Sequence, residues 1–281
     1  KNKSIENIFS EPERPTLAYL KDYGFSEHMI TNFFQPFFAG IYLEDDLDTS
    51  SRMFEFVYKM FGTGHAAIPR NGMQAIPDQL ATQLKQTTIR FNTSVKNIKG
   101  NTITLDSDEQ LSAEKIIIAV DPAPFFGAKN IAPAKWKSCY NLYFESSKSV
   151  LKNPIIGLLP GKDLCVNNIH YLSDLYAPEA NIDKTILSVT VVKSHNLSEK
   201  QLVIKVKEEL KNYCNIETGE LVRLFHIKKA LPKINYLKYQ PTEASATLAP
   251  STYCCGDYLA NGSLNAAMAS GRVAARLVSK D

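Results

Sequence analysis

The chain has 281 residues, of which 44% are hydrophobic, and its formal net charge is +3. The apolar content is sufficient for the buried cores of one or two domains, and the small, scattered charge argues against a nucleic-acid-binding face. No apolar run reaches the length of a membrane span, and we expect no signal peptide. The five cysteines contain no Cys-x-x-Cys pair, which indicates neither a zinc site nor a disulfide framework and favours a reducing, cytoplasmic setting.

Residues 1–65 are predicted to be mainly helical and apolar. A helix that includes residues 16–20 ends at Gly24, and Ser26 begins a second helix. The aromatic-rich run 33–42 has two interpretations, core packing or the wall of an apolar substrate cavity. A serine at position 50 or 51 is expected to cap a third helix.

The clearest β unit is predicted at residues 88–120. Its strands are expected at 88–91, 94–98, 102–105 and 115–120, with turns around Gly100 and the acidic stretch 106–109. The last strand is apolar throughout, which is typical of a strand buried on both faces.

The composition changes after Asp121-Pro122, where a second sheet is predicted. Its strands are expected at 136–146, 153–159, 168–174, 185–193 and 221–229. An amphipathic helix is predicted to begin near Ser198. The five scattered histidines are interpreted as surface or internally satisfied residues, so no metal site is predicted, and no hydrolase arrangement occurs.

The most informative stretch is the last one. A short apolar segment runs into Gly256-Asp257, and a helix is predicted from about Ser263 onward. Backbone N–H groups at the start of that helix lack intrahelical partners and would suit a phosphate or a ring carbonyl. Asp257 is placed to accept hydrogen bonds from hydroxyl groups. The helix carries small residues for close packing and an apolar stripe formed by Leu264, Met268, Gly271, Ala275 and Val278.

The string from Gly256 to Gly271 resembles the C-terminal flavin-binding motif of the FAD-dependent amine oxidase, phytoene desaturase and protoporphyrinogen oxidase superfamily. The resemblance implies an FAD cofactor, with Gly256 and Asp257 at its ribityl or pyrophosphate region. The helix start would face the flavin ring through the N–H groups of Gly262, Ser263 and Leu264.

The resemblance also implies a fold and a domain layout. The fold would be α/β (α+β), with a partial Rossmann-like FAD domain, containing the β-meander, and a substrate domain of mixed sheet and helices. The FAD domain would comprise residues 66–122 and 245–281, and the substrate domain residues 1–65 and 123–244.

The same resemblance adds four candidate residues. A valine matching Val95 contacts the adenine through its backbone, although Val95 is equally explained as an ordinary strand residue. Asn71-Gly72 stands where the family often has two glycines near the flavin; Asn71 tolerates a positive φ, but its role as a contact is weakened. Lys137 is close to the position from which many amine oxidases place a lysine near the flavin, and no other catalytic residue is assigned.

The family normally opens with a strand, a Gly-x-Gly-x-x-Gly turn and a helix, and this sequence contains no such string. The chain therefore resembles roughly the C-terminal two-thirds of those proteins. We expect the isolated chain to bind FAD weakly or not at all and to show no turnover. We also expect it to cover an exposed sheet edge by self-association.

Together these features predict the C-terminal part of an FAD-dependent oxidoreductase. It would oxidise a C–C or C–N bond of a small, apolar substrate by hydride transfer to flavin. Two alternatives stay open: a non-catalytic module that has lost the nucleotide-binding finger but keeps a substrate or partner surface, and one subunit of a split enzyme. Peripheral contact with a membrane also stays open.

Overall fold

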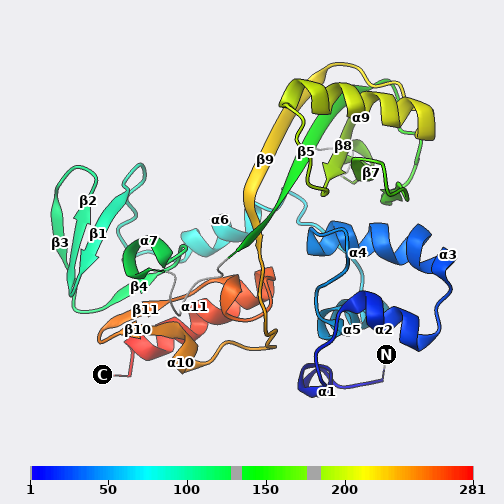
Figure 1. Ribbon diagram of the computed structural model, residues 1–281. Coiled ribbons are helices and arrows are strands. Elements are labelled where there is room, and N and C mark those ends of the chain that lie inside the picture. The colour runs from blue at the N-terminus through cyan, green and yellow to red at the C-terminus, as the bar shows by residue number, and fades with distance from the viewer. Residues whose placement is uncertain (1, 128–134, 176–184, 281) are drawn as a thin grey trace. The chain divides into compact units, whose positions relative to one another are not determined.

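A computed structural model describes residues 2–127, 135–175 and 185–280 (Figure 1). The chain forms two compact units. Unit 1 comprises residues 12–75 and 136–231, and unit 2 contains the described residues within 2–11, 76–135 and 232–281. Helices and sheets are mixed in both units, so the predicted α/β class is confirmed. Residues 66–75 of the predicted FAD domain lie in unit 1, whereas 2–11 and 232–244 of the predicted substrate domain lie in unit 2. The roles assigned to the two domains stay predictions.

The N-terminal part of unit 1 is helical, as predicted. Gly24 ends its first helix in the left-handed region (φ 95°), which favours glycine. Ser26 and Ser50 cap two later helices, because their side chains accept the N–H groups of Met29 and Arg52. The helices are α2 (Thr16–Tyr23), α3 (Glu27–Met29), the π-helical η1 (Ile30–Phe34), α4 (Gln35–Tyr42) and α5 (Ser51–Thr63).

The aromatic run 33–42 mostly forms a helical core. Phe34, Phe38 and Tyr42 are buried, together with Phe54 of α5. The ring centroids of Phe38 and Phe54 are 4.9 Å apart, a distance typical of packed aromatic pairs. Of the two interpretations of this run, the structure supports core packing.

Unit 1 also contains a five-stranded sheet in the order β6-β7-β8-β5-β9. The β6–β7, β7–β8 and β8–β5 pairs are antiparallel. The predicted second sheet is therefore confirmed, along with its amphipathic helix. Two of its predicted strands were too long, because only Gly157–Leu158 of 153–159 is a strand and residues 172–174 belong to a short helix. The elements are β5 (Trp136–Ser146), β6 (Gly157–Leu158), β7 (Val166–Tyr171), α8 (Leu172–Leu175), β8 (Thr185–Val191), α9 (Glu199–Cys214) and β9 (Leu221–Pro232).

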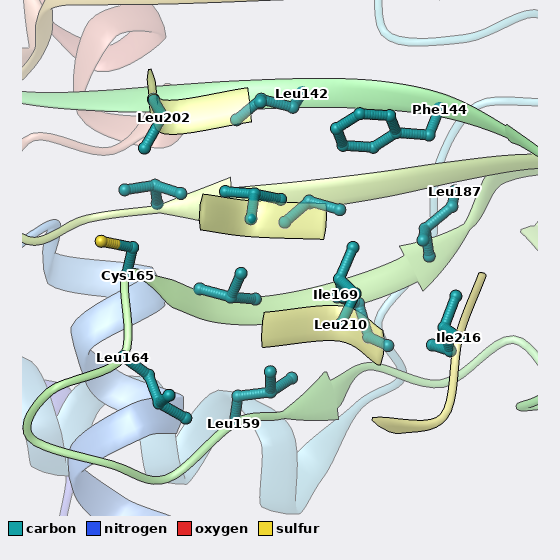
Figure 2. Close-up of a cluster of buried hydrophobic side chains, with 14 of the residues drawn as sticks. Leu142, Phe144, Leu159, Leu164, Cys165, Ile169, Leu187, Leu202, Leu210 and Ile216 are labelled. Carbon is teal, nitrogen blue, oxygen red and sulfur yellow. The ribbon is translucent and has the colours of Figure 1, made fainter. Parts of the chain in front are cut away.

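Helix α9 runs along one face of this sheet and closes the main core of unit 1 (Figure 1). Leu142 and Phe144 of β5 lie on the same side as Leu202 and Leu210 of α9 (Figure 2), and all four side chains are fully buried. Because successive strand residues point to opposite faces, the odd-numbered residues of β5, including Tyr143, lie on the other face of the sheet.

One buried carboxylate ties α9 to the beginning of β7. Both carboxylate oxygens of Glu209 lie 2.9 Å from the backbone nitrogen of Cys165, and one also accepts the N–H of Val166 at 2.9 Å. The ammonium group of Lys205 lies 3.4 Å from Glu209 on the same helix. The charge buried with Glu209 is therefore compensated by donors.

Unit 2 contains two three-stranded sheets. One is the antiparallel β-meander β1-β2-β3, and the other has the order β10-β11-β4, with β11 and β4 parallel. Helix α11 packs beside β11 (Figure 1). The elements are α1 (Ile5–Ser10), α6 (Ala75–Thr82), β1 (Val95–Lys99), β2 (Thr102–Leu105), β3 (Gln110–Ser112), β4 (Ile116–Ile118), α7 (Ala123–Phe126), α10 (Glu243–Ala246), β10 (Thr247–Ala249), β11 (Thr252–Cys254), η3 (Asp257–Leu259) and α11 (Leu264–Val278).

Two details of the predicted β unit were wrong. Residues 88–91 form no strand. A strand needs a neighbouring strand to pair its backbone N–H and C=O groups, and this segment has none within the described part of the chain. The side chain of Phe91 is 81% exposed. The third strand of the meander is β3 instead, and β4 leaves it to pair with β11. Ile116 and Ile118 are buried, but Ile117 and Val120 are exposed, so β4 is not buried on both faces.

Candidate functional site

The C-terminal motif of unit 2 forms a tight turn between β11 and α11. The aromatic ring of Tyr258 lies so close to Gly256 that a side chain at position 256 would collide with it. The N–H of Gly256 donates to the hydroxyl of Ser270 at 2.8 Å, and this hydroxyl donates to the carbonyl of Ala267 at 2.7 Å. Ser270 is fully buried, so the small-residue face of α11 does lie close to the turn, as expected.

The start of α11 is organised by Ser263. Its hydroxyl accepts the N–H of Ala266 at 3.1 Å and donates to the side-chain oxygen of Asn261 at 2.7 Å. Asn261 in turn donates to the backbone carbonyl of Lys238 at 2.9 Å. The helix start is therefore fixed to the segment that precedes α10, which holds its N–H groups in a defined direction.

One of the three N–H groups that were expected to be unpaired at this helix start is hydrogen-bonded. The N–H of Gly262 donates to the carbonyl of Asp257 at 3.0 Å, because the 3₁₀ turn η3 brings that carbonyl beneath it. Within residues 2–127, 135–175 and 185–280, the N–H groups of Ser263 and Leu264 have no hydrogen-bond acceptor. These two groups are donors that the loop can offer to a ligand.

Removing the cap of α11 is expected to destabilise unit 2 modestly. Ser263→Ala deletes the acceptor of the Ala266 N–H, and loss of such a cap costs about 1 kcal/mol. Urea unfolding followed by far-UV circular dichroism measures this change. Asn265→Ala is the control, because Asn265 is exposed and lies two residues after Ser263. This variant should change the free energy of unfolding by less than half as much.

Asp257 supplies a half-buried carboxylate beside these donors. Burial raises the pKa of Asp257, while backbone N–H groups at Asp257 and Tyr258 act in the opposite direction. Burial also raises the pKa of Tyr258, with Cys254 adding to the effect, so the phenol stays protonated at neutral pH. The turn therefore offers one anionic acceptor and two backbone donors within a few residues.

The remaining predicted contacts lie elsewhere. Val95 begins β1 opposite Leu105 and is partly exposed, in the other sheet of unit 2. Asn71 and Gly72 belong to unit 1, in the turn before α6. The left-handed residue of that turn is Gly72 (φ 79°), whose N–H donates to the carbonyl of Pro69 at 2.9 Å. Within unit 2 the structure brings together the five candidates of the C-terminal motif, Gly256, Asp257, Gly262, Ser263 and Leu264.

Lys137 of β5 is held in an ion pair in unit 1. Its ammonium group donates to the carboxylate of Glu44 and to the hydroxyl of Thr49, the latter at 2.9 Å. Glu44 also accepts the N–H of Thr49 at 2.5 Å. The side chains of Lys137 and Glu44 are only 13% and 10% exposed. Sequence reasoning missed Glu44, because nothing in its local spacing indicates a partner 93 residues away.

Among the described residues, no group of three or more His, Cys, Asp or Glu side chains could hold a metal ion. No helix in the described ranges is long and apolar enough to cross a bilayer.

Comparison with known proteins identifies the family. The family of flavin-containing amine oxidoreductases matches the chain over residues 5–279. The chain belongs to this family. For a flavin-containing amine oxidoreductase, the cofactor is FAD and the reaction class is oxidoreduction. A search of curated proteins found no match.

Several solved structures have a similar fold. An oxidoreductase from Methanosarcina mazei is 13% identical, with a TM-score of 0.68, over 97% of this chain and 70% of that chain. The PF1083 protein from Pyrococcus furiosus is 15% identical, with a TM-score of 0.69, over 99% and 71% of the two chains. Wild-type putrescine oxidase bound to putrescine is 13% identical, with a TM-score of 0.60, over 95% and 68%. At these identities the similarity shows the fold alone.

The C-terminal turn fits the family's cofactor. Gly256 leaves no side chain of its own in the turn, Asp257 offers an acceptor for hydroxyl groups, and Ser263 and Leu264 offer backbone donors at the positive end of α11. The side chains of Leu264, Met268 and Val120 are exposed, whereas Ile116 and Ile118 of β4 are buried.

Proposed function

We propose that this flavin-containing oxidoreductase oxidises a C–C or C–N bond of a small organic molecule by hydride transfer. Bound FAD would supply the two-electron acceptor. The observation that carries the proposal is the turn between β11 and α11, where an anionic acceptor and two unpaired N–H groups lie within a few residues of one another. In this proposal unit 2 holds the cofactor and unit 1 binds the substrate.

Each residue of the turn has a distinct role in the proposal. Asp257 accepts hydrogen bonds from cofactor hydroxyls. The N–H groups of Ser263 and Leu264, with the dipole of α11 behind them, stabilise negative charge at the helix start. Val95, Asn71 and Gly72 are secondary candidates for cofactor contacts. For Lys137 we propose a positioning role, because its ammonium group holds residues 44–49 against β5.

The substrate is not proposed to be apolar. The aromatic run 33–42 was the reason to expect an apolar cavity, and most of its rings are used in the helical core of unit 1. That run therefore gives no support to an apolar cavity, and the substrate class has to be argued from the sheet of unit 1.

The cofactor assignment is tested with Asp257→Ala. Loss of a hydrogen bond to a charged acceptor costs about 1.5–3 kcal/mol, so the FAD dissociation constant should rise by about one to two decades. Calorimetric titration of the chain measures this constant, with FAD raised to high concentration because the chain has no Gly-x-Gly-x-x-Gly turn. Asp257→Asn keeps an acceptor and should have a smaller effect.

Asp108→Ala is the matched control, because Asp108 lies in an exposed turn of the β-meander. Equal FAD dissociation constants for wild type and Asp257→Ala would contradict the assignment. A wild-type chain that stays colourless at saturating FAD would favour the non-catalytic binding module over the enzyme.

A further inference from the structure

The face of the five-stranded sheet opposite α9 carries a row of polar side chains. His170 of β7 pairs with Ser188 of β8, which pairs with Tyr143 of β5. Residues directly opposite one another on neighbouring strands place their side chains on the same face. A second polar row runs beside the first, formed by Asn168, Thr190 and Asn141.

The hydrogen bonds across these rows run from Ser188 through Asn141 to Tyr143, each residue donating to the next. The hydroxyl of Ser188 donates to the side-chain oxygen of Asn141 at 3.2 Å, and the amide of Asn141 donates to the hydroxyl oxygen of Tyr143 at 3.0 Å. Because Tyr143 accepts in this chain of bonds, its own hydroxyl proton is left to donate. In the part of the chain that the structure describes, that proton has no acceptor.

Strand β9 adds an aromatic ring and a positive charge beside Tyr143. The ring of Phe225 meets the ring of Tyr143 edge-on, with centroids 6.1 Å apart, and the guanidinium of Arg223 lies 5.5 Å from the centre of the Phe225 ring. Arg223 is exposed, and its charge is permanent at any physiological pH.

This face carries other ionisable groups besides Arg223, namely His170, Lys137 and Glu145. Burial lowers the pKa of His170, so its imidazole is neutral at pH 7. Lys137 is paired with Glu44. Glu145 follows Tyr143 by two residues on the same face, and its backbone bonds to Gly219 and Glu220, so Arg223 has to outweigh this carboxylate for an anion to bind.

We propose that Tyr143, Asn141, Ser188, Phe225 and Arg223 form a subsite for a carboxylate attached to a planar or aromatic group. The Tyr143 hydroxyl donates to a carboxylate oxygen, Arg223 supplies the opposite charge, and Phe225 packs against the planar group. Asn141 and Ser188 are positioning residues that orient the Tyr143 hydroxyl. The inference rests on the proposed role of unit 1 in substrate binding.

Benzoate and its neutral analogue benzamide are the probes, titrated calorimetrically into the full chain without FAD. Wild type is expected to bind benzoate about tenfold or more tightly than benzamide, because only benzoate forms charge-assisted bonds. Arg223→Gln should remove this preference. Tyr143→Phe should weaken benzoate binding by about tenfold, the loss expected for one hydrogen bond to a charged group.

Tyr140→Phe is the matched control, because Tyr140 lies on the same strand but on the opposite face, stacked against His226 at 4.1 Å. Equal affinity for benzoate and benzamide, or no saturable binding of benzoate, overturns the inference. An equal loss from Tyr140→Phe and Tyr143→Phe overturns it as well. Arg223 is exposed, so Arg223→Gln decides the question even if Tyr143→Phe fails to fold.

The cofactor assignment and the carboxylate subsite can be contradicted independently of each other. Titration of the same variants with FAD reports on the turn in unit 2, and titration with benzoate reports on the sheet of unit 1. Normal FAD binding without any benzoate preference contradicts only the carboxylate subsite. Normal benzoate binding in a chain whose FAD affinity is insensitive to Asp257→Ala contradicts only the cofactor assignment.

Discussion

Phe144→Ala is expected to lower the free energy of unfolding of unit 1 by about 3–5 kcal/mol. The ring is fully buried between the sheet and α9, so its removal leaves a cavity that the neighbouring side chains can only partly fill (Figure 2). The ammonium group of Lys207 also lies 5.6 Å from the centre of the ring, and this contact is lost with it.

The fluorescence of Trp136 measures this effect in urea, because Trp136 is the only tryptophan in the sequence and lies on the same strand. Val222→Ala on β9 is the control, since Val222 is exposed and its loss should cost less than about 1 kcal/mol. A comparable loss of stability in the two variants would contradict the core assigned to unit 1.

Glu209→Leu should be similarly damaging for a different reason. It leaves the N–H groups of Cys165 and Val166 buried without their acceptor. Each buried unsatisfied donor costs about 1–3 kcal/mol, so the two together are expected to cost about 2–6 kcal/mol. Glu209→Gln keeps one side-chain oxygen and should lose about half as much.

The same tryptophan fluorescence follows the unfolding of these variants. Glu208→Gln is the control, because Glu208 is the exposed neighbour of Glu209 on α9. If Glu209→Leu were as stable as wild type, the apolar side chain would have compensated for the lost acceptor, and the carboxylate would not be what fixes α9 to β7.

Elements with a clear local sequence pattern were predictable, whereas pairings between distant segments were not. The alternating pattern at 136–146 and the capping signal at Ser198 predicted β5 and α9, because alternation and caps are local properties. Residues 88–91 have strand-like composition, but their state depends on a neighbouring strand. For the same reason, the parallel pairing of β4 with β11 could not be inferred from either segment alone.

The candidate site divides in the same way. The string from Gly256 onward predicted the turn, a helix start near Ser263 and the candidate acceptor Asp257, since all three lie within one short segment. The bond from the Gly262 N–H to the Asp257 carbonyl depends on the geometry of η3 and was missed. The polar row at Tyr143 depends on the register of three strands, and no pattern within one strand reveals it.

The pairing of β4 with β11 also sets the order in which the chain acquires its structure during synthesis. The strand Ile116–Ile118 leaves the ribosome long before its partner strand Thr252–Cys254. At a synthesis rate of about 5–20 residues per second, the partner strand follows several seconds later or more. The second segment of unit 1, residues 136–231, is synthesised in that interval, and residues 12–75 precede it. A nascent chain stalled before residue 252 would therefore hold a folded unit 1 beside an unpaired, isoleucine-rich strand, which is the type of segment that chaperones bind.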